Sequence, residues 1–155
     1  MSSLKELLLE EEELNPKPKY KLYCDMDGVL TNFDERFEHF TGKLPRKWEE
    51  DKKREYGDKK GTQMFWDLID NQIGVRFWAG MKWTPEGQKL WDFIKNYNPA
   101  LLTSPSRQET SRLGKNIWVK NNLEPKPKVI FKYSKEKHAY ANENAIHIDD
   151  RRYHQ

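Results

Sequence analysis

Four short apolar runs are spaced along the chain, and each ends at turn-forming or charged residues. These runs are residues 20–24, 100–102, 129–131 and 145–148. Their shortness and their aliphatic and aromatic content favour buried strands over helices. Apolar residues three and four positions apart fill much of the sequence between them and predict helices. Strands that alternate with helices form a parallel sheet with helices on both faces, so the pattern predicts an α/β, Rossmann-like fold.

Helical spacing of apolar residues marks six segments. They are residues 3–14, 32–42, 64–73, 85–98, 109–121 and 135–142. We expect Thr84 to cap the fourth helix, because Pro85 and Glu86 after it suit a first helical turn. In the fifth helix we expect Leu113, Ile117 and Trp118 to face inward. The stretch 43–63 is highly charged with weak periodicity, and 74–83 is irregular.

The length of 155 residues suits one domain, with room for a small inserted subdomain. Pro16 and Pro18 end the first helix and predict a stiff linker, so residues 1–19 precede the main domain. Hydrophobic residues make up 35% of the chain and charged residues 34%, which predicts a very polar surface. Six tryptophans supply much of the buried area instead and argue against disorder.

Charge and cysteine content limit the classes of function. The net charge of +3 suits an anionic substrate, but the basic residues are scattered, so a dedicated nucleic-acid binder is not favoured. The single cysteine, Cys24, excludes an internal disulfide and a multi-cysteine zinc site, and it suits the reducing cytoplasm. Leu7–Leu9 is followed at once by glutamates and is not a signal peptide. With no apolar run near the ~20 residues of a membrane span, we expect a cytoplasmic protein.

Polar residues follow the carboxyl ends of all four predicted strands. They are Asp25 and Asp27, then Thr103 and Ser104, then Lys132, and finally Asp149 and Asp150. Ligands of open parallel sheets bind outside these ends, so the groups are expected to converge. An isolated Asp-x-Asp-Gly is explained equally well by a turn. Four carboxylates at one edge, however, repel each other and favour a bound cation. Oxygen ligands select a hard ion, which is Mg²⁺ when phosphate is also present.

Hydroxyl and lysine side chains could then hold the phosphate. Thr103 and Ser104 offer hydroxyl and backbone N–H groups, although helix capping is an alternative role for both. A lysine before the fourth strand could neutralise the phosphate, and Lys132, Lys135 and Lys137 are the candidates. For each lysine taken alone, a solvated surface position is the alternative.

Four segments, in this order, resemble the motifs of the haloacid dehalogenase superfamily. They are Cys-Asp-Met-Asp-Gly-Val-Leu, Leu-Leu-Thr-Ser-Pro-Ser, a lysine-containing segment, and Ile-His-Ile-Asp-Asp-Arg. The resemblance covers residues 20–151, nearly the whole chain. Within the superfamily, the Thr-Ser-Pro segment, the later Gly-Lys-Asn-Ile-Trp-Val of residues 114–119 and the Ile-Asp-Asp-Arg end are most similar to 5′(3′)-deoxyribonucleotidases and their phage and bacterial relatives.

The resemblance implies roles for the aspartates. Asp25 would attack phosphorus and form an aspartyl-phosphate, and Asp27 would protonate the leaving oxygen and later activate water. Mg²⁺ would be held by the Asp25 side chain, the Asp27 backbone carbonyl, and either Asp149 or Asp150. The other member of that pair would lie beside the metal.

The resemblance also implies the remaining contacts to phosphate. Thr103 would bind the phosphoryl group, with Ser104 next to it. Lys137 matches the family lysine best, because Lys137 to Ala141 leads into the last strand as the family helix does. Lys135 is the second choice.

A family cap would occupy residues 32–80, between core segments 20–31 and 81–155. Its closure would exclude water and set specificity. Its aromatic residues could stack on a nucleobase, and Arg76 could meet a phosphate, but aromatics at helical spacing favour a core of the cap itself. They are Phe33, Phe65, Trp66, Phe77 and Trp78. Relatives continue beyond the last motif, whereas this chain ends five residues after Asp150, so we expect weaker support behind that residue.

The expected function is a Mg²⁺-dependent phosphomonoesterase that acts on a nucleotide. A polynucleotide 3′-phosphatase and a non-catalytic binding module with the same fold are the alternatives. A P-loop kinase lacks its Gly-x-x-x-x-Gly-Lys-Ser/Thr motif here, and the four histidines lack zinc-ligand spacing. A phosphoacceptor signalling domain would need an aspartate after a middle strand, and neither the second nor the third predicted strand ends at one.

Overall fold

A single parallel sheet organises the part of the chain that the computed structural model describes, which is residues 3–7, 9 and 20–150. Its strands are β1 (Lys21–Cys24), β2 (Ala100–Thr103), β3 (Val129–Phe131) and β4 (Ala145–Ile148). They lie in the order β3-β2-β1-β4, and every neighbouring pair is parallel. Tyr23 of β1 is opposite Ala100 on one side and His147 on the other. The predicted α/β, Rossmann-like fold is therefore confirmed.

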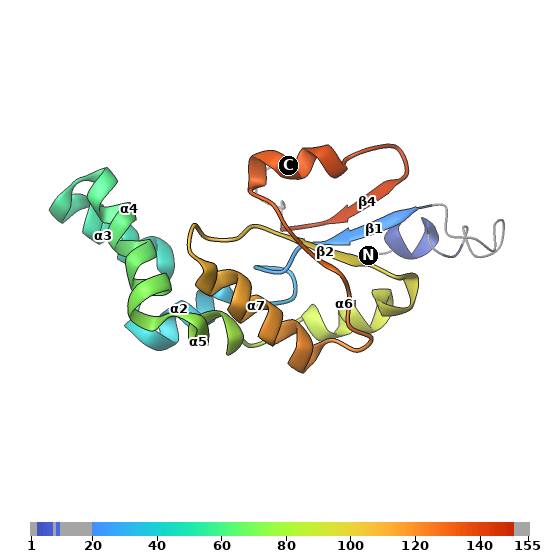
Figure 1. Ribbon diagram of the computed structural model, residues 1–155, viewed down its shortest axis with the longest axis horizontal. Coiled ribbons are helices and arrows are strands. Elements are labelled where there is room, and N and C mark those ends of the chain that lie inside the picture. Colours follow the sequence, from blue (N-terminus) through green and yellow to red (C-terminus); the bar gives the residue numbers. More distant parts are fainter. Residues whose placement is uncertain (1–2, 8, 10–19, 151–155) are drawn as a thin grey trace.

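Three connections cover the sheet. They contain α6 (Gly87–Ile94) followed by η2 (Lys95–Tyr97), then α7 (Glu109–Asn122), and then the 3₁₀-helix η3 (Ser134–Tyr140). Figure 1 shows α6 and α7 on one side of the strands and η3 on the other. This follows from right-handed crossovers, because the chain moves outward from β1 to β3 and then returns past β1 to β4. The reversal beside β1 marks the strand end where such sheets bind ligands.

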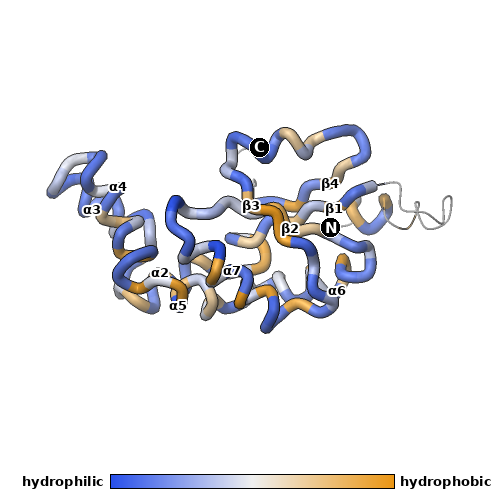
Figure 2. The backbone as a smooth tube through the Cα atoms, in the orientation of Figure 1, coloured by the Kyte–Doolittle hydropathy of each residue, from blue (hydrophilic) through white to orange (hydrophobic). Residues whose placement is uncertain are grey.

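The segment between β1 and α6 contains most of the remaining helices. They are α2 (Phe33–Thr41), α3 (Pro45–Tyr56), α4 (Asp58–Asp67), the π-helix η1 (Leu68–Ile73) and α5 (Val75–Ala79). We call residues 32–80 the cap segment. Figure 1 shows α3 and α4 projecting away from the sheet, and Figure 2 shows that both are largely hydrophilic, in contrast to β2.

The charged stretch 43–63 is helical although its apolar periodicity is weak. Pro45 takes the first position of α3, where its fixed φ suits a helix. Three ion pairs at i,i+4 spacing support the helix, and Lys47 lies 2.9 Å from Asp51 in one of them. The Trp48 and Phe65 rings are 6.0 Å apart. Salt bridges and a narrow aromatic contact thus replace a broad apolar stripe.

Three local predictions were wrong. The irregular stretch 74–83 contains α5, which packs against α7. Thr84 does not cap α6, which begins at Gly87, because its hydroxyl donates instead to the Val29 carbonyl at 2.7 Å. Leu113 and Ile117 point outward and are 54% and 43% exposed. The buried face of α7 is formed instead by Ser111, Gly114, Lys115, Trp118 and Val119.

The first predicted helix is seen in part. Residues 3–7 and 9 are helical, and Leu4 joins the hydrophobic core. The rest of the predicted helix 3–14, the linker up to residue 19 and the Arg of the last motif lie outside the described residues. Within the described residues, no helix combines the length and apolar character needed to cross a membrane.

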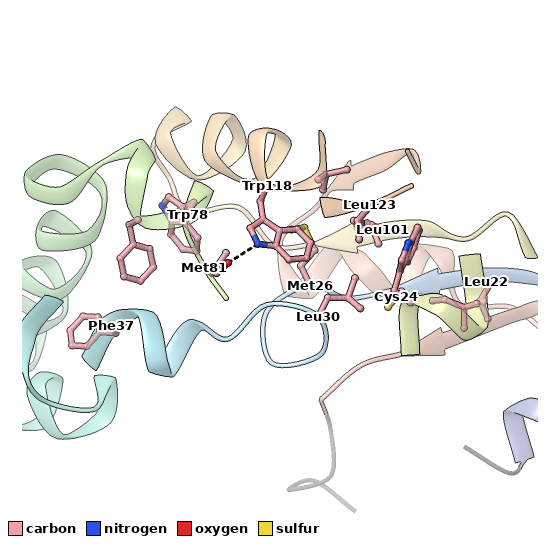
Figure 3. Packing of buried hydrophobic residues seen from close by; sticks show 14 of the residues in the cluster. Leu22, Cys24, Met26, Leu30, Phe37, Trp78, Met81, Leu101, Trp118 and Leu123 are labelled. Carbon is pink, nitrogen blue, oxygen red and sulfur yellow. Dashed lines mark hydrogen bonds between the residues drawn. The ribbon is translucent and has the colours of Figure 1, made fainter. Parts of the chain in front are cut away.

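Trp118 is a buried residue of the hydrophobic core between α7 and the sheet. Its indole N–H donates to the Met81 carbonyl at 2.7 Å, and Figure 3 shows this ring near Met26 and Leu30 of the turn after β1. The Trp83 ring meets Trp118 edge-on, with centroids 5.0 Å apart. The turn after β1 and the segment 81–83 thus pack onto one face of α7.

Gly114 allows α5 and α7 to approach closely. A Cβ at this position would overlap the Trp78 Cβ and lie 2.7 Å from the Val75 carbonyl oxygen. We expect Gly114→Ala to lower the free energy of unfolding by about 2 kcal/mol, because overpacking outweighs the better helix propensity of alanine. Thermal unfolding would show a Tm lower by roughly 4–8 °C. The control is Leu113→Ala on the exposed face of the same helix, with a change within about 0.5 kcal/mol. Equal Tm values for the two variants would contradict the close approach.

Candidate active site

The turn after β1 aims Asp25 and Asp27 at the carboxyl edge of the sheet. Asp25 continues the strand by donating its backbone N–H to the Ile148 carbonyl at 2.9 Å. The chain then closes a tight turn, in which Gly28 has a φ of +81° and donates to the Thr31 carbonyl. The Thr31 hydroxyl donates in turn to Asp27 Oδ1 at 3.0 Å. Two carboxylates are thereby fixed side by side in the site.

Opposing electrostatic effects act on the Asp25 carboxylate. Its Oδ1 accepts the Met26 backbone N–H at 2.8 Å, and its Oδ2 lies 3.4 Å from the Lys137 ammonium. Burial raises the pKa of the Asp25 carboxyl above its ordinary value of 3.8, because it penalises the charged form. Lys137 lowers this pKa, and the neighbouring Asp27 raises it, with a net upward shift. A bound cation would favour the charged form of this carboxyl and offset the penalty of burial.

Lys115 is the principal site residue that the sequence reasoning missed. It projects from α7, and its side chain is 0% exposed. Its ammonium donates to Asp27 Oδ2 at 2.9 Å, to the Thr103 hydroxyl at 2.8 Å and to the Ser104 carbonyl at 2.8 Å. These three bonds use all three N–H groups of a lysine. The available signal was the helical spacing of Lys115, which lies four positions after Ser111 and three before Trp118, both on the buried face of α7.

Thr103 and Ser104 lie where the strand pattern placed them. Thr103 is buried at the end of β2, and its carbonyl accepts the Lys132 backbone N–H at 3.1 Å. The Ser104 hydroxyl is 3.2 Å from that of Ser134, at the start of η3. The second and third connections thus meet through this pair of hydroxyls, while Ser104 reaches the Lys115 ammonium through its backbone carbonyl.

The lysines proposed from sequence separate in the structure. Lys137 joins the site through Asp25, with a side chain 18% exposed. Lys135 is exposed, and its backbone carbonyl contacts the His138 imidazole. Lys132 contributes the backbone bond to Thr103 described above. Of these three, Lys137 alone forms an ion pair with an aspartate among the described residues.

All four predicted aspartates line one cavity of about 1160 Å³, together with Lys137 and Ser134. Asp150 lies directly over the turn, since a Cβ on Gly28 would be 2.7 Å from Asp150 Oδ2. This close approach requires glycine at position 28, where φ is also positive.

The donors around this cavity fit a hard divalent cation such as Mg²⁺. Carboxylate oxygens could come from Asp25 and from Asp149 or Asp150, and a carbonyl oxygen could come from Asp27. Among the described residues, no three His, Cys, Asp or Glu side chains are grouped as ready metal ligands. The ligand set expected from the sequence has only two carboxylate side chains, and its third ligand is a backbone carbonyl. It therefore does not require a group of three such side chains.

The cap aromatics form a core, as the helical spacing favoured. Phe65, Phe77 and Trp78 are buried, and Phe33 packs among them. Trp66 differs because it is 39% exposed. It lines a cavity of about 660 Å³ with Asp27 and Asp150, and it also lines another of about 990 Å³.

Arg76 lies away from these cavities. Its guanidinium lies over the Phe40 ring, 5.5 Å from the ring centroid. The structure thus places this arginine within the cap segment and away from the four aspartates.

Comparison of the sequence with protein-family models and with curated proteins gives no match.

Proposed function

We propose that this chain is a Mg²⁺-dependent phosphomonoesterase of the haloacid dehalogenase type, acting on a nucleotide through an aspartyl-phosphate. The observation that carries the proposal is the contact network of Asp27, Thr103 and Lys115 beside the Asp25 carboxylate. It combines a carboxylate nucleophile, an acid–base carboxylate, a hydroxyl and an ammonium at one strand edge. That set suits a transferring phosphoryl group, for which positioning and charge are the main catalytic requirements.

In the first half-reaction, a carboxylate oxygen of Asp25 attacks phosphorus. The bond from phosphorus to the leaving oxygen breaks, and Asp27 gives a proton to that oxygen. The Lys115 ammonium, which donates to Asp27 Oδ2 and to the Thr103 hydroxyl, adds positive charge behind the phosphoryl group. In the second half-reaction, Asp27 takes a proton from water as the water attacks phosphorus. Inorganic phosphate leaves, and the Asp25 carboxylate is restored.

The cation would be held by Asp25, the Asp27 carbonyl and Asp150 or Asp149. When bound, Mg²⁺ supplies positive charge that favours ionised Asp25 and neutralises phosphoryl oxygens. Lys137 supplies a further positive charge 3.4 Å from Asp25. Burial opposes ionisation of the Asp25 nucleophile, and the positive charges of Mg²⁺ and Lys137 would both offset that effect.

Removal of Mg²⁺ is expected to lower hydrolysis of a generic aryl phosphate by at least about 100-fold, because the charge on the phosphoryl group is no longer offset. Phosphate release would be measured after treatment with EDTA and again after addition of excess Mg²⁺. The same dialysis without EDTA is the control. Unchanged turnover in EDTA would argue against a metal-dependent reaction.

A polynucleotide 3′-phosphatase is the second candidate, and one observation favours it. Exposed Trp66 and Tyr133 line the cavity of about 990 Å³, beside basic residues that could follow a nucleic-acid backbone. These basic residues are Lys53, Lys59, Lys60 and Arg107. Three aspartates line the same cavity and offset most of that charge, so the mononucleotide remains our first choice.

A substrate panel separates these candidates. It compares kcat/KM for 5′- and 3′-mononucleotides with that for 3′-phosphorylated oligonucleotides. The double variant Lys59→Ala/Lys60→Ala would lower kcat/KM for oligonucleotides alone if the second candidate holds. Inactivity on every phosphate ester would favour the non-catalytic binding module, against which the complete pair Asp25 and Asp27 argues.

A further inference from the structure

Asp70 is a buried acid of the cap segment that the proposed chemistry does not use. It lies in the π-helix η1, and it is 3% exposed. Its Oδ1 accepts the Ser106 hydroxyl at 2.9 Å, the Thr110 hydroxyl at 3.0 Å and the Trp78 indole N–H at 3.3 Å. No ion pair to Asp70 occurs among the described residues. One oxygen therefore gathers three neutral donors.

Two of these donors belong to the loop and helix that follow β2. Ser106 lies two residues after Ser104, and its backbone N–H donates to the Ser111 hydroxyl at 2.9 Å. Thr110 is in the first turn of α7. Because the Ser104 carbonyl accepts from the Lys115 ammonium, the loop that Asp70 fixes is also a wall of the proposed phosphate site.

The third donor gives a second route to the same lysine. Trp78 donates its indole N–H to Asp70, while the Lys115 ammonium lies 5.1 Å from the centroid of a Trp78 ring. Cation–π attraction acts at this distance. The Trp78 Cβ also packs against Gly114, next to Lys115. Trp78 thus lies between a carboxylate of the cap segment and the ammonium of the site.

Packing alone does not explain a carboxylate at this position. Burial of a charged group costs free energy, and apolar residues of similar volume often replace such groups without loss of stability. Three donors from three segments instead define a single position for η1 relative to α5 and the loop after β2. The Asp70 carboxylate is therefore better explained by fixing the relative position of these segments than by adding to the free energy of unfolding.

We propose that Asp70 is a positioning residue, which sets the Lys115 ammonium and the loop after β2 through Trp78, Ser106 and Thr110. The inference rests on the proposed function for its kinetic consequences. Through these contacts, the position of the cap segment would determine the position of the Lys115 ammonium in the phosphate site. Asp70 itself would contact neither substrate nor metal.

The test compares Asp70→Asn, which keeps an acceptor oxygen, with Asp70→Leu, which removes it. Hydrolysis of an aryl phosphate with Mg²⁺ is followed well below the Tm of each variant, with circular dichroism to confirm folding. We expect Asp70→Leu to lower kcat roughly 10- to 100-fold, as a displaced catalytic group does. Asp70→Asn should stay within about threefold of wild type. The matched control is Asp67→Leu, an acid on the preceding turn that bonds only to Asn71 and Gln72 among the described residues.

A second variant covers the possibility that Asp70→Leu does not fold. Trp78→Phe keeps an aromatic ring beside Lys115 and removes the N–H that reaches Asp70. If Asp70 acts through Trp78, Trp78→Phe should lower kcat severalfold on its own, and adding Asp70→Asn should cause no further loss in the double variant. Wild-type kcat in Trp78→Phe, or in folded Asp70→Leu, would overturn the proposal.

Binding of inorganic phosphate separates this inference from the proposed function. Calorimetry with Mg²⁺ and phosphate needs no turnover, and we expect Asp70→Leu to weaken phosphate affinity about tenfold. A wild-type chain that binds phosphate but hydrolyses no ester would defeat the proposed function and leave Asp70 to be judged on affinity. Equal phosphate affinity in wild type and folded Asp70→Leu would defeat the positioning role.

Discussion

Asp25→Asn is expected to lower turnover of an aryl phosphate by on the order of 10⁴-fold, because the amide cannot form the covalent intermediate. The Met26 N–H can still donate to the amide oxygen, so the turn after β1 should keep its shape. Initial rates with Mg²⁺ would be compared for wild type and variant. Asp92→Asn, on the exposed face of α6, is the control. Turnover preserved in Asp25→Asn would remove the nucleophile assignment and, with it, the proposed mechanism.

The same substitution should make the metal-free protein more stable near neutral pH. Burial raises the pKa of Asp25 in the folded state, so folding favours the protonated carboxyl. The protonated Asp25 carboxyl contributes to the free energy of unfolding in full below its ordinary pKa of 3.8. This contribution is lost as the pH rises through the higher pKa of the folded state. Asparagine has no such titration. Tm measured against pH in EDTA should therefore fall more steeply for wild type than for Asp25→Asn above pH 4.

Lys115→Met should lower kcat/KM by roughly 100- to 1000-fold, because it removes a positive charge that is buried from water beside the phosphoryl site. The comparison is Lys137→Met, for which we expect a loss of about tenfold or less, since Lys137 makes one longer contact and is partly exposed. Steady-state kinetics at saturating Mg²⁺ measure both. The reverse order of losses would restore Lys137, the lysine favoured by sequence, as the main phosphate ligand.

Lys115→Met also tests whether the lysine is needed for folding. Asp27 keeps its bond from Thr31 and is partly exposed, so water can replace the missing ammonium. We therefore expect a folded variant with a Tm within several degrees of wild type. A collapse of the fold would assign Lys115 a structural role in addition to the catalytic one.

The sheet could be predicted from sequence because its strands are short apolar runs with polar ends. Helix α3 could not, since it has no buried residue and depends on i,i+4 ion pairs and contacts with α4. Thr84 shows a different limit. Its sequence context suits a helix cap, but a tertiary bond to Val29 takes its hydroxyl. Local preference was overridden there by a contact between residues 55 positions apart.

The strand-end rule located Asp25, Asp27 and Thr103, but it had no means of finding Lys115. That lysine lies within α7, and it reaches the site only because a particular face of the helix is buried. Leu113 and Ile117 suggested a face turned by about 100°, one residue along the helix, from the buried one. The face predicted from Leu113 and Ile117 therefore left Lys115 outside the core, whereas the packing of α5 on α7 buries it.

Cys24 has a practical consequence for spectroscopy. It is the single cysteine of the chain, and burial, with the neighbouring Asp25, raises the pKa of its thiol. Maleimides react with exposed thiolates, so the native protein should resist labelling while folded. Lys59→Cys on exposed α4 and Lys89→Cys on exposed α6 would then accept a donor–acceptor dye pair without removal of a native cysteine. Energy transfer between those dyes could follow movement of the cap segment during single turnovers.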